Sequence, residues 1–148
     1  WATRPRELDG VTVHCGDDAL PGVLAEADVV VCMLPLTPGT RERLDAEVFA
    51  AMKPGAAFVN VSRGEVVDEA ALVAALQSGH LSGATLDVFA AEPLAPDHPL
   101  WSLPGVLITP HLASVALPKS AAPQIAANIR AVQTGGDVVN QVSRVRGY

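Results

Sequence analysis

Three side chains in this sequence, Arg63, Glu92 and His111, are of types that together could act on a small acid with a carbonyl group. A guanidinium presents a rigid fork of donors that fits a carboxylate with two hydrogen bonds. An imidazole titrates near neutral pH, so it can give a proton to a developing alkoxide and take it back. A neighbouring carboxylate stabilises the imidazolium and fixes which ring nitrogen faces the substrate. Reduction of a 2-keto acid by a nicotinamide needs these tasks, and we predict Arg63 as carboxylate anchor, His111 as acid/base and Glu92 as its modulator.

Each of these residues has an ordinary structural explanation when it is considered alone. An arginine after a strand is usually solvated or capping, a glutamate before proline usually lies on the surface, and His111 could contact a helix end. Their order is more informative, because each follows a separate apolar run that is typical of a strand. The carboxyl ends of parallel strands share one edge of the sheet, where α/β proteins bind ligands. We therefore predict that all three side chains lie at that edge.

Strand-like and helix-like segments alternate along the chain, which is typical of a parallel sheet with crossover helices. The predicted strands are 11–14, 28–35, 56–61, 84–88 and 106–109. The run at 28–35 has no polar alternation, which predicts a strand buried on both faces. The predicted helices are 18–27, 40–52, 68–77 and 118–133. The helix at 68–77 has acidic residues in its first turn and a glycine just past its end, which suits both helix termini.

Composition narrows the class of protein. The chain has 148 residues, enough for one domain, and is 49% hydrophobic but only 4% aromatic, which predicts an aliphatic core. A net charge of −6 without a basic run argues against a nucleic-acid partner. Cys15 and Cys32 lack metal-ligand spacing, so we predict no metal site, free thiols and a cytoplasmic location. No apolar stretch reaches membrane-spanning length, and no membrane association is predicted.

Several segments carry a family resemblance. Segments 60–72, 86–93 and 109–111 resemble the signatures of the D-isomer-specific 2-hydroxyacid dehydrogenases, and 34–37 and 98–101 extend the resemblance. The ending, 141–148, resembles that of the glyoxylate/hydroxypyruvate reductase branch. The resemblance implies an α/β fold with a Rossmann-like doubly wound parallel sheet. It also implies reduction of a small 2-keto acid by NAD(P)H, a homodimer in the full-length enzyme, and the roles given above for Arg63, Glu92 and His111.

The same resemblance implies a set of cofactor contacts along the chain. Leu34 and Pro35 would lie on the adenosine side, and Thr40 near the cofactor phosphate or ribose. Asp87 would bind the carboxamide, and Ala113 stands near the nicotinamide where the family often has glycine. The nicotinamide side would be contacted by Val61, Ser62 and Arg63, and His111 is a further predicted cofactor contact.

Thr3 and Arg4 correspond, by this resemblance, to the end of the second strand of the dinucleotide fold. An acidic residue at that point would bind a ribose 2′-hydroxyl, whereas an arginine can accept a 2′-phosphate. NADP is therefore the preferred cofactor. NAD is the alternative if Arg4 and Arg6 are only solvated loop charges.

The sequence contains no Gly-x-Gly-x-x-Gly, although the dinucleotide fold needs that loop for the backbone to approach the pyrophosphate. The resemblance places this loop, the first strand and the substrate domain outside these residues. We expect residues 1–148 to be an N-terminally truncated, incomplete dinucleotide-binding domain with a C-terminal tail at about 136–148. Such a fragment is expected to be inactive alone, and its backbone at 29–34 would be an unpaired apolar edge.

Two alternatives remain beside a reductase of the glyoxylate/hydroxypyruvate type. A dinucleotide-binding, corepressor-like assembly protein could retain Arg63, Glu92 and His111, but the absence of basic patches favours the enzyme. A phosphoglycerate dehydrogenase-like enzyme is weakly disfavoured by Arg4, because such enzymes are usually linked to NAD. Formate dehydrogenases resemble the same motifs but typically carry glutamine where Glu92 stands, so Glu92 counts against a formate dehydrogenase.

Overall fold

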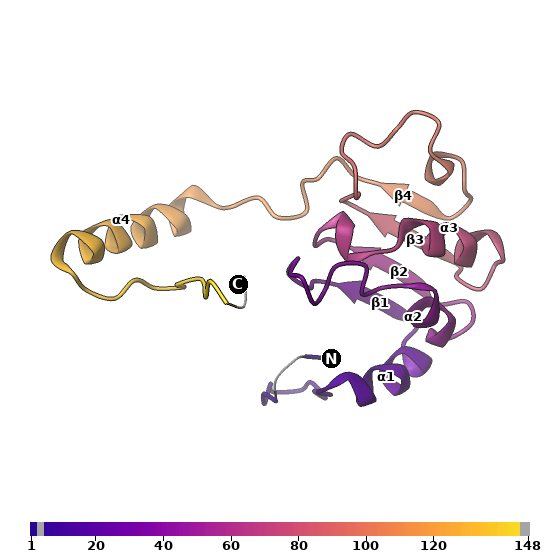
Figure 1. The fold of residues 1–148 in the computed structure, drawn as a ribbon, viewed down its shortest axis with the longest axis horizontal. Helices are drawn as coiled ribbons and strands as arrows, with labels where there is room; N and C mark the ends of the chain where they lie inside the picture. The colour runs from indigo at the N-terminus through magenta and orange to yellow at the C-terminus, as the bar shows by residue number, and fades with distance from the viewer. Residues whose placement is uncertain (3–4, 146–148) are drawn as a thin grey trace. The chain divides into compact units, whose positions relative to one another are not determined.

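The computed structural model describes residues 1–2 and 5–145, and the chain divides into two units between His111 and Leu112. The first unit contains a four-stranded sheet in which all neighbours are parallel and the strands follow chain order (Figure 1). The strands are β1 (Val29–Cys32), β2 (Ala57–Asn60), β3 (Gly83–Leu86) and β4 (Val106–Ile108). Their last residues lie side by side in the register: Cys32, Asn60, Leu86 and Ile108. The predicted α/β class with a parallel sheet is confirmed, and the carboxyl ends form one shared edge.

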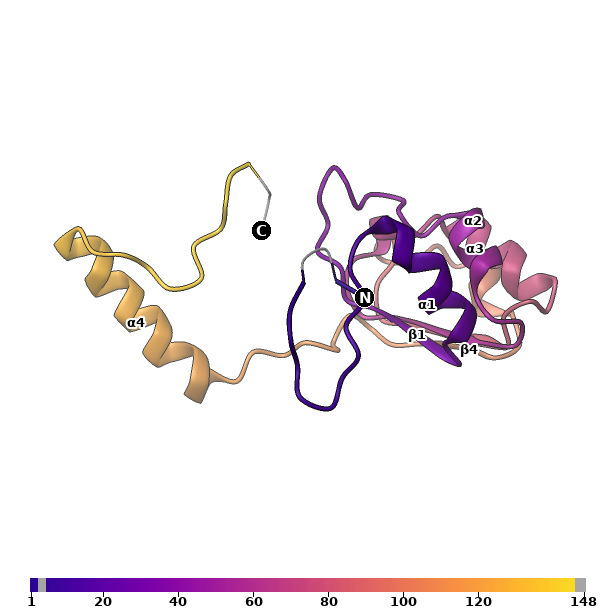
Figure 2. The ribbon, with the colours of Figure 1, turned by 90° about the horizontal axis from the view of Figure 1, so that it is seen from below.

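Three helices cover one face of this sheet, as Figure 2 shows from a second side. They are α1 (Leu20–Glu26), α2 (Ala46–Ala51) and α3 (Glu69–Gln77). Local residues define both ends of α3. The Asp68 carboxylate caps its N-terminus by accepting from the amides of Ala70 and Ala71, and Gly79 follows its C-terminus with a left-handed φ of 74°. The predicted helix at 68–77 is confirmed.

The core lies between these helices and the sheet face beneath them. Phe49 of α2 meets Phe58 of β2 edge to face, with ring centroids 5.3 Å apart. Leu72 of α3 and Leu86 of β3 are also buried there. The remaining buried side chains are mainly aliphatic, as the composition predicts, so burial of Val, Leu and Ala surface stabilises the layer.

The opposite sheet face is open among the described residues, which corrects one prediction. Val29 and Val31 of β1 are 56% and 51% exposed, and Leu107 of β4 is 58% exposed. The strand predicted to be buried on both faces is therefore buried on one, because the described helices of this unit cover only that side. The described residues of the first unit hold no helix on the second face of the sheet, and β1 pairs only with β2 among them.

Two further predicted elements are wrong. The helix expected at 40–52 begins only at Ala46, because the Asp45 carboxylate caps it by accepting from the Val48 amide at 3.0 Å. Leu44 instead forms a β-bridge with Val67. The strand expected at 11–14 is not formed, since Val11 makes only a single bridge, to Leu8, and no longer ladder supports it in the described chain.

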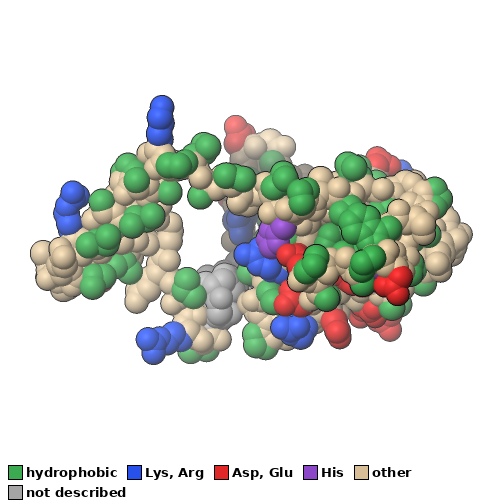
Figure 3. All heavy atoms as spheres, turned by 90° about the horizontal axis from the view of Figure 1, so that it is seen from above, with side chains coloured by type: hydrophobic (Ala, Val, Ile, Leu, Met, Phe, Trp, Pro, Cys, Tyr) green, Lys and Arg blue, Asp and Glu red, His purple; other side chains and the backbone are tan. Residues whose placement is uncertain are grey.

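The second unit contains α4 (Pro118–Thr134), which confirms the helix predicted at 118–133. None of its residues is buried, and Ile125, Ile129 and Val132 stand exposed on it. Figure 3 shows hydrophobic side chains, in green, on the surface of this unit. Gly135 ends the helix with a left-handed φ of 70°, and the Asn128 side chain exchanges two hydrogen bonds with the Val139 backbone. Within the described ranges, no helix is both long and apolar enough to cross a membrane.

Candidate active site

Glu92 and His111 are directly paired. The Nδ1 atom of His111 lies 2.8 Å from Oε2 of Glu92. The other carboxylate oxygen of Glu92 accepts a hydrogen bond from the Phe89 amide at 2.9 Å. The two side chains, 50% and 37% exposed, are open to a ligand. The prediction that Glu92 and His111 lie together is consistent with this geometry.

The charge state of Glu92 follows from its partners. The hydrogen bond with His111 holds the pKa of the Glu92 carboxyl below its ordinary value, and the Phe89 amide acts in the same direction. Partial burial and the nearby Asp87 carboxylate oppose that effect on the pKa. Glu92 is therefore an acceptor at neutral pH, suited to orienting an imidazole.

His111 is held in place by the ends of two neighbouring strands. It follows β4 in a left-handed backbone conformation with φ 52°, which residues other than glycine seldom adopt. Its amide donates to the Thr109 carbonyl at 3.1 Å. The Thr109 hydroxyl donates in turn to the Asp87 carboxylate at 2.5 Å, at the end of β3, where Asp87 is only 3% exposed. These contacts fix the turn that presents the imidazole.

An open hollow of about 400 Å³ lies beside this pair. Its volume is within the range of small-molecule sites, which combine an apolar lining with a few convergent polar groups. The polar lining comes from Asp87, Glu92, Thr109 and His111, and the apolar lining from Phe89, Pro93, Leu94, Trp101, Ile108 and Pro110.

Arg63 is placed differently from the other two predicted catalytic residues. It follows β2 on the same sheet edge and is exposed. Its guanidinium donates to the carbonyl of its own neighbour, Ser62, at 2.6 Å. Within the described part of the chain, no hydrogen bond or ion pair joins Arg63 to Glu92 or His111. The structure therefore brings two of the three residues together and leaves the third at a nearby strand end.

Asn60, which sequence reasoning missed, organises the turn that carries Arg63. Its side chain is almost fully buried, at 1% exposure, yet all of its polar atoms have partners. Its Oδ1 accepts from the amide and hydroxyl of Ser62, and its Nδ2 donates to the Arg63 carbonyl at 3.2 Å. An asparagine closing an otherwise apolar strand was the available signal.

Gly64 is the second residue that sequence reasoning missed. A Cβ added at this position would lie 1.8 Å from the Phe89 carbonyl carbon and 2.2 Å from the Ala90 amide nitrogen. Only glycine allows this approach. The turn with Arg63 therefore packs against the turn that leads to Glu92, and the signal was a glycine directly after the candidate arginine.

The predicted cofactor residues mostly follow strand ends. Leu34 and Pro35 come after β1, Ser62 after β2, and Asp87 after β3. The Thr40 hydroxyl donates to the Pro35 carbonyl at 2.6 Å, so it closes the loop after β1. Ala113 belongs to the second unit, and Thr3 and Arg4 lie outside the described residues. The described residues hold no cluster of three side chains that could bind a metal.

Comparison with known proteins identifies the family of this chain. Residues 2–113 match the family described as D-isomer specific 2-hydroxyacid dehydrogenase, NAD binding domain. The chain belongs to this family. The resemblance stated from the sequence is thereby confirmed, and the parallel sheet is that of the family's NAD-binding domain.

Similar members of the dehydrogenase family include a curated reductase and two solved structures. Glyoxylate/hydroxypyruvate reductase A of Yersinia enterocolitica is 42% identical over 148 residues, which are 100% of this chain and 47% of that protein. A D-isomer specific 2-hydroxyacid dehydrogenase from Xanthobacter autotrophicus, crystallised with NADPH and MES, is 56% identical with a TM-score of 0.97, covering 100% of this chain and 61% of that one.

The second structure is an NADPH-dependent glyoxylate/hydroxypyruvate reductase from Sinorhizobium meliloti in complex with NADP and sulfate. It is 33% identical, with a TM-score of 0.92, and the match covers 100% of this chain and 48% of that one. The chain thus spans about half the length of the curated relatives that it matches.

Proposed function

We propose that this chain supplies the cofactor-binding and acid/base part of a reductase that converts a small 2-keto acid, of the glyoxylate/hydroxypyruvate type, to a hydroxy acid with NADPH. The observation that carries the proposal is the Glu92–His111 pair beside an open hollow. The names of the Yersinia and Sinorhizobium proteins support the substrate class. A homodimer and a cytoplasmic location stay predictions.

In this proposal His111 is the proton donor. Because Glu92 contacts Nδ1 of His111, the other ring nitrogen, Nε2, is the one that faces the substrate. Glu92 stays ionised at neutral pH, so it stabilises the imidazolium before the proton leaves. The chemistry supplied by bound NADPH is transfer of a hydride to the carbonyl carbon. His111 gives its proton to the carbonyl oxygen, which becomes the hydroxyl of the product.

Arg63 is assigned to the substrate carboxylate. Its main chain is held by Asn60 while its guanidinium is exposed and bonded only to a local carbonyl in the described chain. Exchange of that neutral acceptor for a carboxylate forms a stronger, charge-assisted contact. The substrate is then fixed at one end while its carbonyl group faces the imidazole.

Polar residues at the shared strand edge support binding of a dinucleotide there. Ser62 and Asp87 are buried polar residues at the ends of β2 and β3, where parallel sheets bind ligands. Val61 and Ser62 would contact the nicotinamide, and Asp87 would bind its carboxamide. Leu34 and Pro35 would lie on the adenosine side, with Thr40 near the cofactor phosphate or ribose.

An assay with both coenzymes tests the reductase proposal. The natural protein that contains these 148 residues is expected to oxidise NADPH with glyoxylate and hydroxypyruvate. The 148-residue chain alone is expected to show no turnover, because its sequence has no glycine-rich phosphate loop. Absence of turnover by the natural protein with either substrate contradicts the reductase. Turnover by these 148 residues alone contradicts the expectation that a glycine-rich loop is needed.

The coenzyme preference has a separate test. Arg4→Ala in the natural protein is expected to weaken NADPH binding by about tenfold or more while leaving NADH binding nearly unchanged, because only NADPH offers a 2′-phosphate. Calorimetry with each coenzyme measures the two affinities, and Arg41→Ala is the matched control. Equal losses for both coenzymes contradict the assignment of Arg4.

A further inference from the structure

The turn from Phe89 to Glu92 is held by two carboxylates. The Phe89 amide donates to Glu92 itself, and the next amide, Ala90, donates to Oε1 of Glu69 at 2.7 Å. Glu69 is the first residue of α3, and its side chain is only 21% exposed. Its second oxygen lies 3.7 Å from Nε2 of His98. Glu69 therefore links the start of a rigid helix to the turn that carries Glu92.

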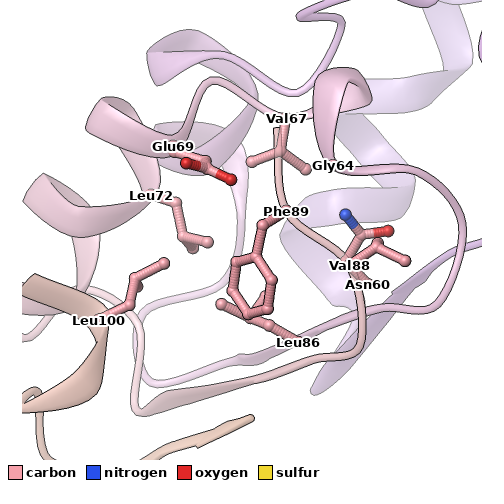
Figure 4. A pocket seen from close by; sticks show the side chains of 9 residues that line it. All are labelled: Asn60, Gly64, Val67, Glu69, Leu72, Leu86, Val88, Phe89 and Leu100. Atoms are coloured by element: carbon pink, nitrogen blue, oxygen red, sulfur yellow. The ribbon is translucent and has the colours of Figure 1, made fainter. Parts of the chain in front are cut away.

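The other side of this turn is packed without space to move. Gly64 touches the backbone of Phe89 and Ala90, where even a methyl group has no room. Figure 4 shows Glu69, Gly64 and Phe89 around one cavity. That cavity measures only about 10 Å³, about the space of a single water probe. The peptide between Phe89 and Ala90 is thus fixed by packing on one side and by a hydrogen bond on the other.

We propose that Glu69 is a positioning residue, which sets the orientation of Glu92 toward His111 by holding the Ala90 amide. A carboxylate that accepts from a backbone amide makes a short, charge-assisted bond. Fixing the Ala90 amide fixes the peptide plane that precedes it, and so the turn whose Phe89 amide engages Glu92. The catalytic meaning of this role rests on the proposed reductase, but its readout needs no substrate.

Glu69 can act on Glu92 in two ways that have opposite signs. His111 and Asp87 are the titratable groups that face Glu92, and the Phe89 amide is its second hydrogen-bond donor. Loss of positioning weakens the bond from Phe89, which raises the pKa of Glu92 toward its ordinary value. Loss of the negative charge of Glu69 by itself removes repulsion, which lowers the pKa of Glu92. The direction of the change identifies the mechanism.

Two variants of the full chain separate these effects. Glu69→Asp keeps the charge and suits the helix start but is one methylene too short to reach the Ala90 amide. Glu69→Gln keeps the reach and a carbonyl acceptor but has no charge. Carbon-13 detection of the glutamate carboxyl follows the titration of Glu92, and amide hydrogen exchange follows Ala90. Glu47→Asp, in the exposed first turn of α2, is the matched control.

With Glu69→Asp we expect a higher pKa of Glu92 and about tenfold faster exchange of the Ala90 amide, because one charge-assisted bond is lost. With Glu69→Gln the pKa of Glu92 is expected to stay or fall, with slower exchange than in the Asp variant. An unchanged Glu92 titration in a folded Glu69→Asp chain overturns the proposal. So does a Gln variant that behaves like the Asp variant. These two readouts do not depend on reductase activity. The role of Glu69 and the proposed reductase function can therefore be contradicted independently of each other.

Discussion

The Glu92–His111 pair and the Arg63 turn lie at the same sheet edge but are held in different ways. The pair is held through its side chains, because Glu92 receives hydrogen bonds from His111 and Phe89 at once. Arg63 is held through its main chain, by Asn60, while its guanidinium contacts only the Ser62 carbonyl in the described residues. The fold itself assembles the proposed acid/base pair, whereas the proposed carboxylate anchor is left for a ligand to orient.

Loss of the imidazole is expected to have the largest effect. In the natural protein, His111→Asn should lower kcat/KM for glyoxylate by about 100- to 10,000-fold, the usual contribution of a positioned acid/base group. Steady-state assays with NADPH measure the change, and His14→Asn, at an exposed histidine far from β4 in the sequence, is the control. Full activity of His111→Asn would show that another group donates the proton.

Gly64→Ala breaks the packing that joins the two turns. The new methyl group would meet the Phe89 backbone, so the free energy of unfolding should fall by about 3 kcal/mol, at the upper end for overpacking. Chemical denaturation measures the loss. The control is Gly22→Ala in α1, where nothing lies within 4 Å and alanine should gain up to about 1 kcal/mol. Equal stability of the two variants contradicts the close approach.

Arg63→Lys tests the anchor without removing its charge. A lysine cannot form the forked contact, so KM for a 2-keto acid should rise by about tenfold or more while kcat changes little. The stability of the protein should stay the same, because the guanidinium is exposed. Arg41→Lys controls for arginine replacement in general. A fall in kcat alone would assign Arg63 to the chemical step instead of binding.

The smallest predicted effect is a pH dependence of stability from Glu92. Its carboxyl pKa is lower in the folded chain than in the unfolded one, so its contribution is fully present above the unfolded pKa. The contribution is lost as the pH falls through the folded pKa. Because the side chain is 37% exposed, solvent limits the effect to at most about 1 kcal/mol. Denaturation of wild type and Glu92→Gln at neutral and acidic pH measures it, and Glu47→Gln should match wild type. An equal acid loss in Glu92→Gln and wild type contradicts this assignment.

The sequence predicted those parts of the fold whose signals are local. The helix at 68–77 has its own acidic cap and a terminal glycine, and both act in the structure. The prediction of a helix at 40–52 was wrong in its bounds. Leu44, Val48 and Met52 are all buried, but they are not all helical. A four-residue apolar spacing identifies residues that reach the core, but Asp45 decides where the helix begins.

For the site, residue types and order were sufficient to select Glu92, His111 and Arg63 as candidates, because their chemistry is carried by the side chain itself. The buried Asn60 and the close approach of Gly64 were missed, because both depend on contacts between segments distant in the chain. The exposure of Val29 and Val31 could not be predicted either, since burial depends on which helices cover a face.

The sequence by itself determined the alternating α/β pattern, the family signatures and the three side chains with the chemistry of a keto-acid reductase. Only the tertiary structure decided that Glu92 meets His111 through Nδ1 and that Arg63 turns to its own neighbour. It also decided that the Ala90 amide, in the turn that leads to Glu92, donates to Glu69. Residue types fix which bonds can form, but the directions of hydrogen bonds depend on where the strand ends and turns place each group in space.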